Sequence, residues 1–446
     1  MYILYFARLS AVLMLGLMGC SSTRDAAWPE ARPLGEHVPA YRAKSDPPDT
    51  PAPDSTLTLS DALALALLHS PNLRAFAWEV RAREAHMLQA GLPPNPEVGG
   101  EIENFNGSGS LDGFDAAEVT FGLSQLVELG GDRQRRKQVA AGERNLAGWD
   151  YETVRVDVLT ETTQSFAAVL AAQERLNLSD TLREQAEQFY ETVLARVDAG
   201  KVSALEEQRA RVVLTKARLD YARGVRELRR TRTRLSATWG STEEPAFGSV
   251  QGTLYAARGV PPFAALADFI QRNPDVARWR DEIALRRADV ALEKTARIPD
   301  PILGIGNRRL RDLGANALTA GISIPLPLFN RNQGAIKAAQ YRIKEGEEAQ
   351  RAAIVLAHHM LADAYERLSM AHEEVTALRD EVLPAARESF AATQEGYREG
   401  KFDLLTVLDT QRTFFEATNQ YIEALETYHL TRAEVERLIG TPLSEI

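Results

Sequence analysis

The segment VTFGLS at residues 119–124 decides the fold, because a related segment, LTAGIS, stands about 200 positions later at residues 318–323. A Pro-Asx-Pro turn precedes each segment, at residues 94–96 and 299–301. The chain therefore repeats an ordered set of elements. Such an internal duplication of about 200 residues predicts an architecture assembled from two like units.

Both segments alternate apolar with small or polar residues in the same phase, which is typical of strands with one apolar face. Each forms a candidate hairpin with the stretch that follows the Pro-Asx-Pro turn, and the expected hairpins are residues 97–127 and 302–326. Alternation of this kind fits the wall of a membrane barrel, but a half-buried hairpin of a soluble sheet would show the same pattern. The strands alone leave both interpretations open.

Two runs with few glycines and prolines predict long helices at residues 132–198 and 333–399, each roughly 100 Å long. Apolar residues of the second run recur at strict sevens, which indicates coiled-coil packing. They are Ile354, Leu361, Leu368, Val375 and Val382.

Each long helix is followed by a Gly-Lys pair, Gly200-Lys201 or Gly400-Lys401, and then by a shorter return helix, expected at residues 203–238 and 403–439. Ser203 and Asp403 are the predicted N-caps of these return helices.

The resulting fold class is α+β, mostly α, with long coiled-coil helical hairpins and two β-hairpins in each subunit. A soluble coiled-coil rod with small β caps is the alternative. The domain ranges are 57–240 for the first repeat, 241–262 for an inter-repeat segment, 263–440 for the second repeat with its own short helices, and 441–446 for a short tail.

The first 56 residues predict export and a membrane anchor. An apolar run within residues 1–19 reads as a signal peptide, and it ends in Leu-Met-Gly before Cys20, which resembles a lipoprotein cleavage site. Cys20 is the expected lipidation site; the alternative is an ordinary signal peptide with an incidental cysteine. Residues 20–56 are rich in proline and read as an extended tether.

Composition excludes several classes of function. A net charge of −10 argues against a nucleic-acid partner. The seven histidines are scattered without a metal-ligand spacing, and the single cysteine cannot form a disulfide within the chain. We therefore expect no metal site, no cofactor and no catalytic residue.

Several further motifs carry a family resemblance that covers nearly the whole mature chain. They are LTLSDAL at 57–63, SPNL at 70–73, QLVELGGDR at 125–133, IPLPLFNRNQG at 324–334 and YREGKFDLLTVLD at 397–409. With the duplicated layout, these motifs make the chain resemble the TolC-like outer-membrane factors, the exit ducts of tripartite pumps. It is most similar to the branch that serves cobalt–zinc–cadmium heavy-metal pumps.

The resemblance implies a homotrimer in the bacterial outer membrane, lipid-anchored, with a shared twelve-stranded β-barrel and a periplasmic tunnel of helices, the α-barrel. Residues 241–262 would form an equatorial belt. Prolines and glycines would mark the transitions between strands and helices: Pro94, Pro96, Gly130, Gly131, Pro299, Pro301, Pro325 and Pro327. The implied partners are outer-membrane lipid, a periplasmic adaptor (membrane fusion protein) and an inner-membrane RND pump.

The resemblance also implies where the duct meets its partners and where it closes. The adaptor would contact the helical tips at Arg196, Gly200, Lys201, Ser203, Gly400, Lys401 and Asp403. The aperture would involve Tyr397, Phe402, Thr406 and Asp409. Phe402 and Thr406 replace an arginine and an aspartate of relatives, so a ring of Asp409 carboxylates is the expected remnant of that gate.

The expected function is a passive duct without enzymatic activity that exports heavy-metal cations. A duct for organic toxicants, drugs or type I secretion is the first alternative. A periplasmic adaptor or scaffold lipoprotein is the second, although an adaptor would show one helical hairpin rather than two.

Overall fold

The computed structural model describes residues 55–399 and 401–446, all of which belong to one unit, Ala43–Ile446. The predicted signal peptide, Cys20, nearly all of the tether and Gly400 lie outside the described residues.

The two repeats contain the same series of elements. The first comprises β1 (Ser55–Thr58), α2 (Leu59–His69), α3 (Pro71–Ala90), β2 (Glu97–Glu103), β3 (Glu118–Leu126), α4 (Asp132–Asp198) and α5 (Ala204–Ala237). After β4 (Phe247–Gln251), the second comprises α6 (Phe263–Ala267), α7 (Pro274–Thr295), β5 (Ile302–Leu310), β6 (Ala315–Ser323), α8 (Gln333–Ala377), α9 (Leu383–Arg398) and α10 (Leu404–Ile439). Short 3-10 turns lie at Gly109–Leu111, Ile270–Arg272 and Leu443–Glu445.

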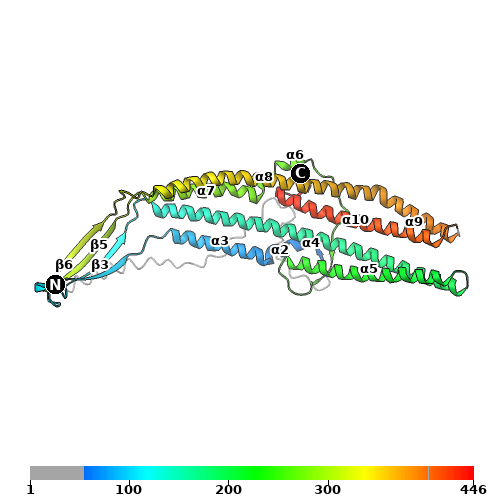
Figure 1. The fold of residues 1–446 in the computed structure, drawn as a ribbon, viewed down its shortest axis with the longest axis horizontal. Coiled ribbons are helices and arrows are strands. Elements are labelled where there is room, and N and C mark those ends of the chain that lie inside the picture. The colour runs from blue at the N-terminus through cyan, green and yellow to red at the C-terminus, as the bar shows by residue number, and fades with distance from the viewer. Residues whose placement is uncertain (1–54, 400) are drawn as a thin grey trace. The chain divides into compact units, whose positions relative to one another are not determined.

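The four-stranded sheet and the helical turns lie at opposite ends of this unit (Figure 1). Strands β2, β3, β5 and β6 extend from one end of α3, α4, α7 and α8, and the reversals between α4 and α5 and between α9 and α10 lie at the other end. The mostly helical α+β class, with long helical hairpins and two β-hairpins, is confirmed.

The two hairpins join into one antiparallel sheet with the order β2-β3-β5-β6. The junction between the repeats is the β3–β5 ladder, which runs from Glu118 opposite Leu310 to Leu126 opposite Ile302. Because paired residues share a face of an antiparallel sheet, one face collects the apolar positions and the other the small and polar ones. The sequence predicted the hairpins but not this pairing.

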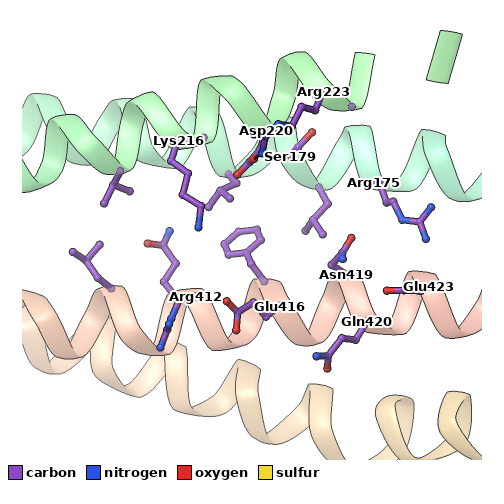
Figure 2. Close-up of a pocket in the computed structure, with 18 of the residues that line it drawn as sticks. Arg175, Ser179, Lys216, Asp220, Arg223, Arg412, Glu416, Asn419, Gln420 and Glu423 are labelled. Carbon is purple, nitrogen blue, oxygen red and sulfur yellow. Dashed lines mark hydrogen bonds and ion pairs between the residues drawn. The ribbon is translucent and has the colours of Figure 1, made fainter. Parts of the chain in front are cut away.

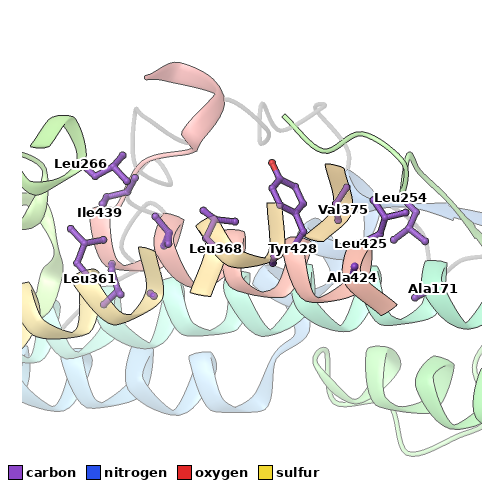
Figure 3. Packing of buried hydrophobic residues seen from close by; sticks show 14 of the residues in the cluster. Ala171, Leu254, Leu266, Leu361, Leu368, Val375, Ala424, Leu425, Tyr428 and Ile439 are labelled. Carbon is purple, nitrogen blue, oxygen red and sulfur yellow. The ribbon is translucent and has the colours of Figure 1, made fainter. Parts of the chain in front are cut away.

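The main core lies where α8 meets α10 and the segment before α7 (Figure 3). Leu361, Leu368 and Val375, three of the predicted seam residues, are fully buried against α10 residues that include Leu425 and Ile439. A smaller core forms around the parallel pair β1–β4, where Leu57 and Phe247 pack with residues of α2, α4 and α5.

The heptad seam does not continue as predicted. Val382 is 42% exposed, whereas Leu378 and Ala386 are buried. Leu378–Val382 forms a π-helix that ends just before Pro384. Proline has no N–H to donate and its ring crowds the preceding turn, so the wider π turn relieves the conflict. The extra residue in that turn rotates the following helix, and the seam resumes one position later.

Candidate functional site

The four-stranded sheet has two chemically different faces. On one face, Val98, Phe121 and Leu318 are 81%, 66% and 89% exposed. The other face bears small residues and charge, with Gly99 opposite Gly122 and Gly122 opposite Gly306. A sheet that exposes its apolar face needs an apolar environment to cover it.

Arg308 organises the polar face. Its guanidinium lies 3.0 Å from Glu103 and 2.9 Å from Glu118, and it donates a 3.0 Å hydrogen bond to the hydroxyl of Thr120. Sequence reasoning missed this cluster, because the three partners sit on two strands of the first repeat and the arginine on the second.

Predicted strand–helix transition residues of both repeats lie near the start of α4. The Gln125 amide donates to the carbonyl of Pro94 at 3.0 Å, and the Val127 N–H donates to the carbonyl of Pro301 at 2.9 Å. Gly131 has a φ of 76° and begins α4, a left-handed backbone that favours glycine. Gly130 lies tightly against Asp132 and against Thr295 of α7, since a Cβ there would be 2.7 Å from the Asp132 carboxylate and 3.0 Å from the Thr295 carbonyl oxygen.

In the second repeat, Asn332 takes the place of Gly131. It has a φ of 56° and begins α8, and its amide donates to the Glu293 carbonyl at 2.9 Å and carboxylate at 2.6 Å. Asn332 was not among the predicted transition residues, although asparagine is the non-glycine residue best suited to this conformation. Pro325 and Pro327 precede this junction, Pro299 stands on the return from α7, and Pro96 lies immediately before β2.

The helical tips differ in how they are capped. Gly200 has a φ of 68°, as a glycine-based reversal requires, and Lys201 next to it is exposed. Asp403 accepts hydrogen bonds from the N–H and hydroxyl of Thr406 at 2.9 and 2.5 Å, and these bonds hold its pKa below the ordinary value. Ser203 occupies the N-cap of α5, the position predicted for it, but its side chain makes no capping bond.

Arg196 and Tyr397 meet across the two hairpins. The Arg196 guanidinium donates a 2.5 Å hydrogen bond to the Tyr397 hydroxyl and lies 5.5 Å from the centre of its ring. These two residues were expected to serve separate roles, Arg196 at the adaptor-contacting tip and Tyr397 at the aperture. Among the other aperture residues, Phe402 packs against Gly396. The Thr406 hydroxyl donates a hydrogen bond to the Asp403 carboxylate. Asp409 forms a 2.7 Å ion pair with Arg412.

A groove of about 1200 Å³ lies between the two helical hairpins, lined by α4 and α5 on one side and by α10 on the other. Lys216 and Asp220 of α5 face Arg412 and Glu416 of α10 across it (Figure 2). Arg175 of α4 closes one end through a 2.7 Å ion pair with Glu426 of α10. We call this space the hairpin groove; its walls come from both repeats.

Within residues 55–399 and 401–446, no group of three or more His, Cys, Asp or Glu side chains is arranged to hold a metal ion. No helix in the same part of the chain is long and apolar enough to cross a membrane.

The profile of one protein family, described as "Outer membrane efflux protein", matches residues 62–241 and 265–441. The chain belongs to this family. The two matched segments correspond to the two repeats, so the outer membrane efflux protein family accounts for the duplication as well as for the fold. The protein is an efflux duct of the bacterial outer membrane rather than an enzyme.

Individual efflux proteins are similar over most of the chain. The cobalt-zinc-cadmium resistance protein CzcC of Cupriavidus metallidurans is 33% identical, over 86% of this chain and 90% of its own. The pyoverdine export outer membrane protein OpmQ of Pseudomonas putida is 25% identical, over 92% and 91%. Among solved structures, CusC has a TM-score of 0.73 at 18% identity, covering 90% of this chain and 98% of its own. The CusC likeness supports the fold alone.

Proposed function

We propose that the protein exports heavy-metal cations as the outer-membrane duct of a tripartite RND-type efflux system. The observation that carries this proposal is the 33% identity to CzcC across 86% of the chain, since CzcC is named for resistance to cobalt, zinc and cadmium. The nickel and cobalt resistance protein CnrC, also of Cupriavidus metallidurans, is 29% identical over 66% of the chain. With no metal-binding cluster among the described residues, the cations would pass through without dedicated ligands.

In this proposal three copies assemble around one axis. The strand order leaves β2 and β6 as the edges of the sheet, and unpaired edges are a template for pairing with another chain. Four strands are too few for a closed membrane barrel, for which about eight is the minimum. Three sheets joined edge to edge would give a twelve-stranded barrel whose exposed apolar face meets lipid and whose polar face lines the duct.

The helical tips would meet the periplasmic adaptor and, through it, the pump. Arg196, Gly200, Lys201, Ser203, Gly400, Lys401 and Asp403 are the proposed contact residues. The Arg196–Tyr397 bond would hold the two hairpins together in the closed duct, with Phe402, Thr406 and Asp409 beside it. Cys20 would carry the lipid that anchors the mature chain.

Metal tolerance of a deletion strain tests the function. We expect the strain to lose tolerance to zinc, cobalt or cadmium, and the intact gene to restore it. A gene with both Gly-Lys turns disrupted should fail to restore it although its product reaches the outer membrane. Unchanged tolerance to every divalent metal would contradict the proposal.

Export of organic compounds is the second candidate, favoured by the 25% identity to the pyoverdine exporter over 92% of the chain. The same strains, grown with antibiotics, detergents and iron chelators, separate the two. Sensitivity to organic compounds alone would support a duct but exclude heavy-metal cations as its substrate.

A further inference from the structure

The two strand–helix junctions of the chain are built alike but carry different charges. At the first, Arg136 near the start of α4 forms an ion pair with Glu128 of the preceding segment. Counted from the left-handed residue that begins each long helix, Lys337 of α8 stands where Arg136 stands in α4. By the same count, Phe329 stands where Glu128 stands. The second junction therefore keeps the cation and lacks the carboxylate that would neutralise it.

A cavity of about 540 Å³ lies at the second junction, next to the end of α7 and the start of α8. Three exposed cations line it, Arg297, Arg331 and Lys337, and no carboxylate is among its lining residues. None of the three forms an ion pair with a described residue. Arg331 donates a 3.3 Å hydrogen bond to the Pro327 carbonyl, and Lys337 lies 5.8 Å from the centre of the Tyr341 ring. We call this space the basic cavity.

The start of α8 adds positive charge of backbone origin to the same place. The first bond within this helix runs from the Ile336 N–H to the Asn332 carbonyl at 3.0 Å. The N–H groups of residues 333–335 therefore have no acceptor within the helix. Gln333 and Ile336 both line the basic cavity. The positive end of a helix attracts anions, so side chains and backbone favour a ligand of the same kind, an anion.

Exposed apolar side chains border the basic cavity and continue the apolar face of the sheet. Leu328 and Phe329 line the cavity and are 63% and 91% exposed. Ile324 and Leu326, beyond the end of β6, are 47% and 73% exposed and keep the alternation that places Leu318 on the apolar face. Aromatic residues flank the apolar band of membrane barrels at the level of the lipid headgroups. The basic cavity therefore lies where acyl chains end and headgroups begin.

We propose that the basic cavity binds the phosphate of an anionic glycerophospholipid in the periplasmic leaflet, with an acyl chain along Leu328 and Phe329. The inference rests on the proposed barrel, because that assembly turns the apolar face toward lipid and the helices toward the periplasm. Arginine binds phosphate oxygens through paired N–H groups, and lysine binds them as a point charge. Three unpaired cations favour a headgroup of net negative charge, phosphatidylglycerol, over the zwitterionic phosphatidylethanolamine.

The first junction shows what removes such a site. Its own cavity is lined by Leu92, Glu128 and Arg136 among others, and Leu92 stands two residues before the Pro-Asx-Pro turn, where the second repeat has Arg297. One cation is therefore replaced by an apolar residue and another is neutralised by a carboxylate. Each subunit then has one site for an anionic lipid, at the second junction, and a trimer has three.

Native mass spectrometry of the full-length protein in detergent, titrated with phosphatidylglycerol or phosphatidylethanolamine, tests the site. We expect the trimer to bind phosphatidylglycerol several-fold more tightly. Lys337→Gln should weaken that binding, and Lys337→Gln with Arg297→Gln should weaken it about tenfold and abolish the preference. Lys216→Gln is the matched control, because it removes the same charge from α5, away from the strands, and should change neither value. Equal binding of both lipids, or a preference that survives the double substitution, would overturn the inference.

Phe329→Glu gives the second junction the carboxylate of the first and removes no cation. At this exposed position it should neutralise Lys337 and abolish the preference for phosphatidylglycerol, and a preference left unchanged would contradict the proposed role of charge.

Inorganic phosphate, added as a competitor, separates a lipid from a soluble ligand. It should displace phosphatidylglycerol only weakly, because it has no acyl chain to contact Leu328 and Phe329. Displacement at equal concentration would assign the basic cavity to soluble phosphate and refute the lipid. The same mass spectra separate the two levels of the argument. A trimer without the lipid preference would refute this inference while leaving the proposed duct intact, whereas a monomer in membranes would refute both.

Discussion

At the scale of single residues, the two repeats use different chemistry for the same task. Asp403 caps α10 through its side chain, whereas Ser203 stands at the same place before α5 and makes no capping bond. Gly131 and Asn332 both begin long helices with a positive φ, one by lacking a side chain and the other by bonding Glu293. The duplication therefore preserves backbone geometry more closely than side-chain identity.

Replacement of Asp403 should loosen the first turn of α10. In Asp403→Ala, the hydrogen bonds from Thr406 are lost, so amide hydrogen exchange at residues 405–407 should rise several-fold. Ser203→Ala is the matched control and should leave exchange in the first turn of α5 unchanged, since no capping bond is removed.

The same cap has a predictable pH dependence. Because the folded-state pKa of Asp403 is lowered, its stabilising contribution is fully present above the unfolded value of about 3.9 and is lost as the pH falls through the folded value. Protection of this turn that stayed constant through strong acid would contradict the assignment.

The Arg196–Tyr397 bond should keep the duct closed. Tyr397→Phe removes the hydroxyl acceptor but keeps the ring, and loss of about 1 kcal/mol per contact would shift the open–closed balance about fivefold. Single-channel conductance in planar bilayers should rise. Arg398→Ala removes a neighbouring cation whose one ion pair among the described residues is with Glu395, so native conductance is expected for this variant. An equal rise in conductance would mean that loss of positive charge, and not loss of the Arg196–Tyr397 bond, causes the effect.

At the scale of elements, one proline changes the phase of a whole helix. The heptad pattern runs unbroken in the sequence from Ile354 to Val382, yet burial follows it only through Val375. The π turn before Pro384 then rotates α9, which turns Val382 and Ala385 outward.

Paired substitutions can verify this change of phase. Leu368→Ala removes a fully buried side chain of the main core and should lower the free energy of unfolding by about 2–5 kcal/mol. Val382→Ala, at the next-but-one heptad position, should cost less than about 1 kcal/mol, because that side chain is 42% exposed. Denaturation of the detergent-solubilised protein measures both. Similar losses would show that the unbroken heptad, and not the shifted one, is correct.

At the scale of the whole molecule, the two repeats depend on each other at every level. The β3–β5 ladder joins them in the sheet, Arg437 of α10 bonds Asp157 of α4 at 2.6 Å, and Arg196 bonds Tyr397 at the tip. Between these contacts, the two helical hairpins are separated by the hairpin groove. The continuous ladder in the sheet and the sparse contacts near the tip are consistent with a duct that is rigid at the sheet and can open and close at the tip.

The sequence by itself determined the duplicated order of helix, hairpin and long helix, the two-sided strands and the glycine reversal at Gly200. These follow from local periodicity and backbone preference, which a few neighbouring residues encode. Only the tertiary structure decided that β3 pairs with β5, that Arg308 joins Glu103 and Glu118, and that Asp409 is paired with Arg412. The first two contacts join positions about 200 residues apart, and the third depends on the rotamers of two exposed side chains. No local pattern specifies the first two contacts, because they depend on how the repeats pack against each other.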